Sequence, residues 1–201
     1  MSVAYQPKAD EIKKLRESTD APMMDCKKAL AEAAGDFERA RELLLARGAA
    51  QAQKKAERAA NEGLIASYIH AGGKIGVLVE VNTETDFVAR NPKFSELTRD
   101  IAMHVAAMSP LYVDRESVPL EVVEKVRAEL AVSVPSGKPA EIAAKIVEGK
   151  LNKWFEEHCL LDQPFVRDDT MSVGDMINRS VGVLGENIKV RRFTKYALGD
   201  R

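Results

Sequence analysis

A strict alternation of apolar residues constrains the fold more than any other feature of this sequence. Between residues 74 and 82 the alternating apolar positions are Ile75, Val77, Val79 and Val81. A period of two is that of a β-strand with one buried face. Residues 64–70 are also strand-like, and the Ala71-Gly72-Gly73 segment between the two strands supplies glycines for a tight turn. The sequence therefore predicts a β-hairpin that packs one face against a core.

The first fifty residues show helical spacing instead. Their apolar positions form three groups: Ala9, Ile12 and Leu15; then Met23, Cys26, Leu30 and Ala33; then Phe37, Ala40 and Leu44. The Gly35-Asp36 pair combines a helix stop with an N-cap, and Gly48 is the expected end of the third helix. Three helices of this length bury little surface, so we expect a small domain of modest stability.

Helical spacing returns after the hairpin. Asn91 and Pro92 predict the cap and the first position of a helix. Its expected buried residues are Phe94, Leu97, Ile101, Val105 and Met108. Residues 119–130 and 142–155 predict two further helices, with the Pro135-Ser-Gly-Lys-Pro139 segment as the breaker between them.

The end of the chain predicts a short helix near residues 172–181 and a closing strand over residues 187–196. Within this strand Phe193 is out of step with Ile188 and Val190, which a β-bulge near Arg191-Arg192 would explain. Strands and helices that alternate in this irregular way indicate an α+β fold.

Composition divides the chain and excludes some function classes. Residues 49–63 are rich in Ala, Lys and Gln, so we expect an N-terminal domain over residues 1–50, a linker over 51–62 and a core domain over 63–201. Lys and Arg number 30 against 31 Asp and Glu, and this balance argues against a direct nucleic-acid partner. The apolar runs are too short to span a membrane. The first ten residues lack the pattern of a signal peptide, so a cytoplasmic location is expected.

A search for chemistry favours a protein without a catalytic site. The Gly-Lys pairs lack the spacing of a phosphate loop, and the three histidines lack zinc-ligand spacing, so neither a cofactor nor a metal is expected. An acid/base enzyme built from Glu84, Asp86 and a histidine is an alternative. His104, however, follows Leu97 and Ile101 on an apolar helix face, where a buried structural histidine is favoured.

Two apolar features are candidates for contact with a partner. Phe87 lies in the Thr85-Asp86-Phe87-Val88 segment, between a strand and a capped helix. The pattern alone favours a ring that folds back as a lid on the core, and an exposed anchor for another protein is the alternative. Met23 and Met24 are consecutive in a helix, so only one of them can face the core and the other is available to a partner.

The same segments carry a resemblance to a known family. The stretches 15–19 and 23–30, with sequences LREST and MMDCKKAL, resemble the N-terminal signature of bacterial translation elongation factor Ts. The stretch 79–91, VEVNTETDFVARN, resembles its core signature, and residues 101–107, 136–139 and 163–166 are similar to further blocks in the family's order.

The resemblance implies a guanine-nucleotide exchange factor, not an enzyme, that binds elongation factor Tu, displaces Mg²⁺ and promotes GDP release. It implies a ubiquitin-associated-like N-terminal domain and a core of antiparallel sheet and helices. It also implies a tip that is inserted into the GTPase, formed by Thr85, Asp86, Phe87 and Val88. It also assigns contacts with the GTPase to Arg16, Met23, Met24, Lys27 and His70.

Two departures from the family pattern affect these expectations. This chain has Asp20 and Pro22 where the family usually has glycine, so the loop before Met23 is expected to be stiffer. It also has a single copy of the strand–tip–helix segment and no long heptad tract. In both respects it resembles the short form of the family, and this resemblance implies a homodimer in which two chains supply the two halves. A homodimer is therefore expected. A general adaptor that binds other folded proteins remains the alternative from a different class.

Overall fold

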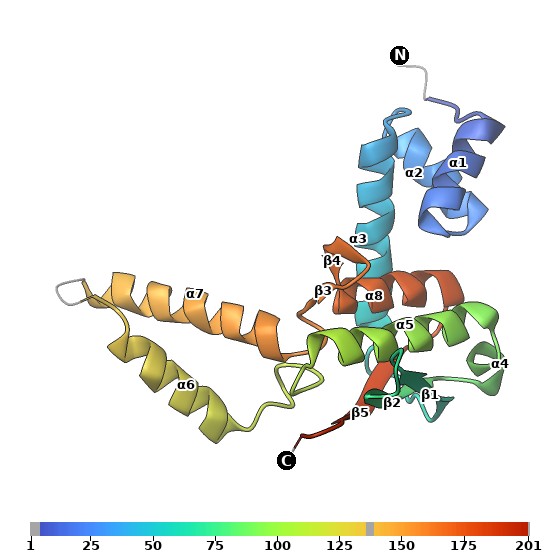
Figure 1. Ribbon diagram of the computed structural model, residues 1–201. Coiled ribbons are helices and arrows are strands. Elements are labelled where there is room, and N and C mark those ends of the chain that lie inside the picture. Colours follow the sequence, from blue (N-terminus) through green and yellow to red (C-terminus); the bar gives the residue numbers. More distant parts are fainter. Residues whose placement is uncertain (1–4, 136–138, 201) are drawn as a thin grey trace. The chain divides into compact units, whose positions relative to one another are not determined.

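The computed structural model describes residues 5–135 and 139–200 (Figure 1). The chain divides into two compact units. The first unit contains the chain up to Leu64 together with Asn82–Leu97 and Ile177–Lys189. The second contains Ile65–Val81, Thr98–Met176 and the chain from Val190. Both units therefore draw on segments that are distant in sequence. The mixture of helices and antiparallel sheet confirms the predicted α+β class.

Three helices begin the first unit: α1 (Ala9–Thr19), α2 (Met23–Glu32) and α3 (Phe37–Lys55). Their shared core consists of Leu15, Cys26, Ala29, Leu30, Ala33, Ala40 and Leu44. The predicted stop and cap between α2 and α3 are confirmed. Gly35 has a φ of 90°, and the Asp36 carboxylate accepts a hydrogen bond from the Arg39 amide at 3.1 Å. The helical spacing of apolar residues in this segment therefore predicted the three helices correctly.

The prediction that Gly48 ends the third helix is wrong, because α3 continues to Lys55. Gly48 is buried where α3 meets α8 (Val173–Leu184). A Cβ atom on Gly48 would lie 3.5 Å from the Asn178 carbonyl oxygen, and one on Gly182 would lie 3.3 Å from the Gly48 Cα. The glycine therefore serves a close helix approach, although it costs about 1 kcal/mol relative to alanine inside a helix.

A three-stranded sheet has the order β1-β2-β5, with strands β1 (Glu62–Ile69), β2 (Ile75–Thr83) and β5 (Lys189–Ala197). The predicted hairpin joins β1 and β2. The His70 amide donates to the Ile75 carbonyl at 2.9 Å, and Gly72 and Gly73 have positive φ values of 90° and 70°. Val77, Val79 and Val81 are buried, as their alternation predicts. In β5 Arg191 and Arg192 are both exposed, which is where the prediction places a bulge.

Helix α5 (Pro92–Met108) begins where the sequence predicts. The Asn91 side chain accepts a hydrogen bond from the Lys93 amide at 2.9 Å, and Phe94, Leu97, Ile101 and Val105 are buried. Met108 was expected in this buried stripe but is exposed. It is the last residue of α5, and the chain turns away at Ser109, whose φ is 52°.

The rest of the second unit contains a helical pair and a small hairpin. Helices α6 (Leu120–Val132) and α7 (Ala140–His158) pack around Val118, Leu151, Phe155 and Cys159. The predicted breaker overlaps residues 136–138, which lie outside the described part of the chain. Strands β3 (Pro164–Phe165) and β4 (Asp168–Ser172) pair antiparallel and were not predicted. None of the helices in the described ranges is both long and apolar enough to cross a membrane.

Candidate functional site: an exposed phenylalanine on a braced turn

The Thr85–Val88 turn presents an apolar ring to solvent. It lies between β2 and α5 and contains most of the one-turn helix α4 (Asp86–Ala89) (Figure 1). The Thr85 hydroxyl caps this helix by accepting a hydrogen bond from the Val88 amide at 3.4 Å. Val88 and Ala89 are buried, whereas Phe87 is 80% exposed. Because Val88 anchors the turn from below, the preceding ring points away from the core.

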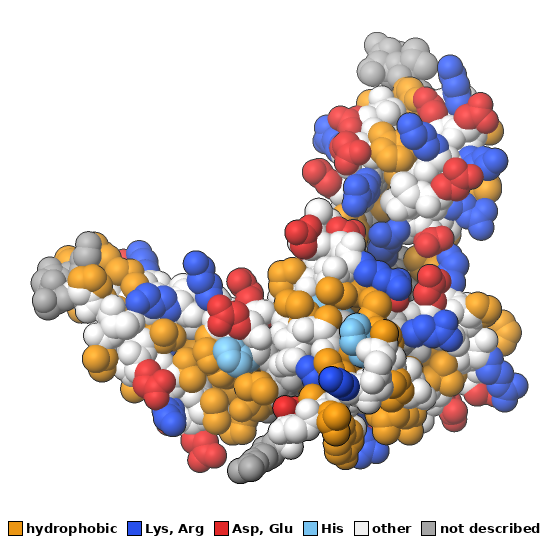
Figure 2. Space-filling view, viewed as in Figure 1, with side chains coloured by type: hydrophobic (Ala, Val, Ile, Leu, Met, Phe, Trp, Pro, Cys, Tyr) orange, Lys and Arg blue, Asp and Glu red, His pale blue; other side chains and the backbone are white. Residues whose placement is uncertain are grey.

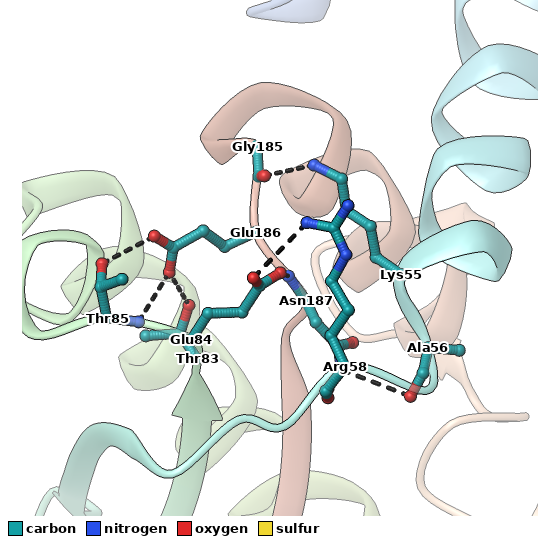
Figure 3. A network of polar contacts seen from close by, with 9 residues as sticks. All are labelled: Lys55, Ala56, Arg58, Thr83, Glu84, Thr85, Gly185, Glu186 and Asn187. Carbon is teal, nitrogen blue, oxygen red and sulfur yellow. Dashed lines mark hydrogen bonds and ion pairs between the residues drawn. The ribbon is translucent and has the colours of Figure 1, made fainter.

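Glu186 binds this turn from the loop that precedes β5 (Figure 3). One carboxylate oxygen, Oε2, accepts hydrogen bonds from the Thr83 hydroxyl and the Thr85 amide, both at 2.9 Å. The other, Oε1, accepts from the Thr85 hydroxyl at 2.6 Å. Burial alone would raise the pKa of Glu186, but the hydrogen bonds from the Thr85 and Thr83 hydroxyls and the Thr85 amide lower it below its ordinary value. The carboxylate is therefore ionised at neutral pH.

A second set of contacts braces the same loop. The Glu84 carboxylate accepts a hydrogen bond from the Asn187 amide at 2.7 Å and lies 3.5 Å from the Arg58 guanidinium. The buried Asn187 side chain donates to the Arg58 carbonyl at 2.8 Å and the Ala56 carbonyl at 3.4 Å. Lys55 donates to the Gly185 carbonyl (Figure 3). The end of α3, the end of β2 and residues 185–187 thus form one polar network beneath the turn.

The remaining residue of the turn, Asp86, is exposed and forms an ion pair with Arg90 at 2.8 Å. Such a surface pair contributes little to stability, because both groups stay hydrated. Asp86 is therefore available to a partner at small cost.

The four N-terminal candidates, Arg16, Met23, Met24 and Lys27, are all exposed on α1 and α2. The sequence placed Met23 on the buried face of its helix, and this prediction is wrong, because Met23 and Met24 are 52% and 60% exposed. Met23 is the first residue of α2, and the packed residues of that helix begin one turn later at Cys26.

The loop before Met23 contains the two departures from the family pattern. Asp20 takes the left-handed conformation, with a φ of 57°, that glycine adopts most easily. Its carboxylate forms an ion pair with Lys93 at 2.8 Å. The Arg179 side chain donates to the Ser18 and Thr19 carbonyls at 2.8 and 3.0 Å. These contacts fix the α1–α2 corner despite the missing glycines.

His70 is exposed on the turn between β1 and β2, in the second unit. Its Nδ1 lies 3.2 Å from the Tyr68 hydroxyl. His70 therefore belongs to a different unit from the other candidate residues, which are all in the first unit. A cavity of about 390 Å³ adjoins it. The residues that line this cavity are Tyr68, His70, Ile75, Met103, Ala106, Ala107, Val166 and Arg167.

The groups considered for catalysis have structural environments. His104 is fully buried, as predicted. Its Nδ1 accepts a hydrogen bond from the Val166 amide at 3.2 Å, so its proton lies on Nε2, 2.9 Å from Gln163 Oε1. Cys26 and Cys159 are buried too, and desolvation raises the pKa of both thiols, that of Cys159 to about 11. Within the described residues, no cluster of three or more His, Cys, Asp or Glu side chains could bind a metal ion.

Glu186 and Asn187 were missed by the sequence reasoning. They lie in a Gly-Glu-Asn segment about one hundred residues from the turn. A carboxylate and an amide beside a glycine are a common loop composition, so local pattern carried no signal. Only the return of the chain beside β2 brings them to Thr85 and Glu84.

Comparison with known proteins identifies the family. The sequence profile described as "Elongation factor TS" matches residues 9–200. The protein named Elongation factor Ts of Thermosipho melanesiensis is 56% identical over 190 residues, which cover 94% of this chain and 97% of the relative. That of Koribacter versatilis (strain Ellin345) is 55% identical over 193 residues, covering 96% and 88%. That of Thermotoga petrophila is 54% identical over 191 residues, covering 95% and 96%.

These matches, together with the fold, define a translation elongation factor. The chain belongs to the elongation factor Ts family. Its role is therefore that of the nucleotide exchange factor for elongation factor Tu in protein synthesis, and an exchange factor does not catalyse a chemical reaction.

Proposed function

We propose that the Thr85–Val88 turn enters the GTPase domain of elongation factor Tu, displaces its Mg²⁺ and thereby promotes GDP release. The observation that supports this most directly is Phe87, an aromatic ring that is 80% exposed on a braced turn. A large apolar side chain in water is unfavourable, and its burial in an interface is a typical source of binding energy.

The displacement follows from how a GTPase binds its nucleotide. Backbone amides and a bound Mg²⁺ supply the strongest contacts to the phosphates of GDP. A phenyl ring inserted between two elements of that cradle would move them apart and remove the ion from its ligands. Asp86 and Thr85 would then lie beside the inserted ring, and Val88 would support it from within this chain.

The energy of one ring limits what the turn can do alone. Burial of a phenylalanine side chain contributes about 1.5–3 kcal/mol, and each tenfold acceleration requires about 1.4 kcal/mol. Phe87 therefore accounts for roughly a ten- to hundredfold acceleration. Arg16, Met23, Met24 and Lys27 on α1 and α2, together with His70, would supply the remaining contacts with the GTPase.

The affinity for the GTPase must depend on the nucleotide. Coupling between two ligands of one protein is reciprocal, so a factor that weakens GDP binding is itself displaced by GDP. GTP, which is more abundant in the cell, then completes the exchange and releases the factor.

Exposed surfaces favour protein partners over nucleic acid. Figure 2 shows basic and acidic side chains mixed over the N-terminal helices, without a continuous basic stripe on this face. Nucleic-acid interfaces generally need clustered Lys and Arg. We therefore infer that the factor acts in the cytoplasm on the GTPase, without direct contact to nucleic acid or membrane.

We also propose a homodimer. The sheet face opposite the buried valines carries exposed apolar side chains from all three strands, namely Ile65, Ile69, Leu78 and Tyr196. An exposed apolar face of this kind favours association. Sedimentation should give a dimer of the 22.1 kDa chain, and Leu78→Glu should shift it to the monomer. A stable wild-type monomer at micromolar concentration would refute the dimer.

The central test measures release of labelled GDP from elongation factor Tu with catalytic amounts of this protein. Wild type should accelerate release, and Phe87→Ala should lower the acceleration about ten- to hundredfold. Val132→Ala, which truncates an exposed valine on α6, should have no effect and is the control.

A chelator separates displacement of the ion from simple binding. If Phe87 acts through Mg²⁺, then removing the ion with EDTA should shrink the difference between wild type and Phe87→Ala. An undiminished difference would contradict the displacement step. Binding without any acceleration of release would indicate an adaptor instead.

A further inference from the structure

The two oxygens of Glu186 accept three donors at the base of the Thr85–Val88 turn. These donors are the Thr83 hydroxyl, the Thr85 amide and the Thr85 hydroxyl. A threonine hydroxyl has one proton. Because the Thr85 hydroxyl donates that proton to Glu186, its lone pairs are left to accept from the Val88 amide. Glu186 therefore orients the very group that caps α4.

The contact is reciprocal between the two segments. Glu186 accepts from the backbone amide of Thr85, and Glu84 accepts from the backbone amide of Asn187 (Figure 3). The Asn187 side chain binds the Arg58 carbonyl and fixes the loop in turn. Residues 185–187 are thus attached on one side to the chain after α3 and on the other to the turn.

The turn needs such support from outside itself. Helix α4 has four residues, and a helix of one turn is not stable alone, because nucleation is unfavourable. Phe87 is 80% exposed and therefore contributes little packing among the described residues. Val88 and Ala89 anchor only the end of the turn that leads into α5. The beginning of the turn, at Thr85, depends on polar contacts.

We propose that Glu186 is a positioning residue for nucleotide exchange: it holds the Thr85–Val88 turn in the conformation that presents Phe87 to the GTPase. This inference rests on the proposed function of Phe87. A preformed turn does not have to be ordered during the encounter, and ordering of flexible segments is one of the main costs of association. Loss of Glu186 would let the turn sample conformations in which Phe87 is misplaced, which lowers the competent fraction.

A double-mutant cycle on GDP release from elongation factor Tu tests the proposal. Glu186→Ala should slow factor-dependent release about tenfold in the wild-type background. In the Phe87→Ala background, the same change should alter the rate by less than about twofold, because the ring that it positions is absent. Glu186→Gln keeps one acceptor oxygen and should give an intermediate rate.

Asp175→Ala is the matched control. The Asp175 carboxylate also accepts from a backbone amide and a hydroxyl, those of Ser172, at 3.1 and 2.8 Å. It lies near the start of α8, whereas Glu186 follows the end of that helix. Asp175→Ala should leave the rate of GDP release unchanged. Equal slowing by Glu186→Ala in both backgrounds, or no slowing in either, would overturn the proposal.

Amide hydrogen exchange on the free protein provides a second measurement. Glu186→Ala should increase exchange at the Thr85 and Val88 amides and leave Val79 and Ile101 in the core unchanged. Increased exchange throughout would indicate general destabilisation and would refute a positioning role. This measurement does not involve the GTPase. Failure of Phe87→Ala to slow GDP release would therefore reject the function proposed for Phe87. Unchanged hydrogen exchange at the Thr85 amide in Glu186→Ala would instead reject the role of Glu186.

Discussion

The side-chain rings of Phe87 and His104 both lie in environments that do not match their polarity. Phe87 is an apolar ring that is 80% exposed, and His104 is a polar ring that is fully buried. Gln163 and the Val166 amide bond both nitrogens of His104 inside the chain, so its burial needs no external partner. Phe87, by contrast, is left mostly uncovered by the described part of the chain.

The difference distinguishes a residue with a structural role from one for which we propose a role in binding. A buried polar group that is hydrogen-bonded costs little to keep and much to disturb. An exposed apolar ring contributes little to folding, so its presence on a braced turn is best explained by a surface that buries it. Four measurements can break or sharpen this comparison, from the largest expected effect to the smallest.

Replacement of His104 should have the largest effect on stability. His104→Ala leaves a cavity and removes a partner from the buried Gln163 side chain, so we expect a loss of about 2–4 kcal/mol. Denaturant unfolding followed by circular dichroism measures the loss. At temperatures where the variant is folded, GDP exchange should be close to wild type. A large defect in exchange by the folded variant would contradict the assignment of His104 to structure.

Acidification should destabilise the protein through the same residue. Burial lowers the pKa of His104 below its ordinary value of 6.5, and the Gln163 hydrogen bond opposes this shift only in part. As the pH falls from 6.5 towards the lowered pKa, the unfolded chain takes up a proton and the folded chain does not. Stability should therefore decrease over this range, by at most about 1.4 kcal/mol per pH unit, and be independent of this group above it.

His104→Gln is the control for the acid effect. It removes the titrating ring and leaves His70 and His158 in place, so the slope between pH 6.5 and 5 should be shallower than in wild type. Equal slopes in the two proteins would show that other groups cause the pH dependence.

The methionine pair should matter less than Phe87. Met23 and Met24 lie on the first turn of α2, and methionine makes adaptable contacts whose individual loss is small. Met23→Ala with Met24→Ala should reduce exchange several-fold, whereas leucine at both positions should retain most of the rate. A reduction larger than that of Phe87→Ala would reverse the assigned importance of the two surfaces.

Truncation of Phe87 should have the smallest effect on folding. Because the ring is exposed, Phe87→Ala should change the free energy of unfolding by no more than about 0.5 kcal/mol. The same unfolding experiment used for His104 checks this. A loss above about 2 kcal/mol would mean that the ring packs within this chain, as in the lid alternative.

Much of the secondary structure follows from local chemistry. The Gly72-Gly73 turn, the valines of β2, the Gly35-Asp36 junction and the Asn91-Pro92 start of α5 all lie where pattern predicts them. Periodicity and capping act within a few residues, so a single sequence contains the necessary information. The failures, at Gly48, Met23 and Met108, concern helix ends and the neighbours that cover them.

The candidate site divides in the same way. Thr85, Asp86, Phe87 and Val88 were identified in sequence, but the pattern alone favoured Phe87 as a lid on the core. The 80% exposure of Phe87 shows that this preference was wrong. Glu186 and Asn187 were not identified at all. Glu186 contacts Thr85, and Asn187 contacts Glu84, across more than one hundred residues, and no local pattern encodes such a distance. The division into domains at residues 50 and 63 stays a prediction.

The amino acids alone determined the α+β class, most helices and strands and the family, because spacing, capping and signature motifs are properties of adjacent residues. The tertiary structure alone decided which apolar residues stay in water, why Gly48 lies inside a helix and what braces the turn beneath Phe87. These three features depend on which distant segments meet. The chain returns from α8 beside β2, and this return brings Glu186 to the three groups that donate hydrogen bonds to it.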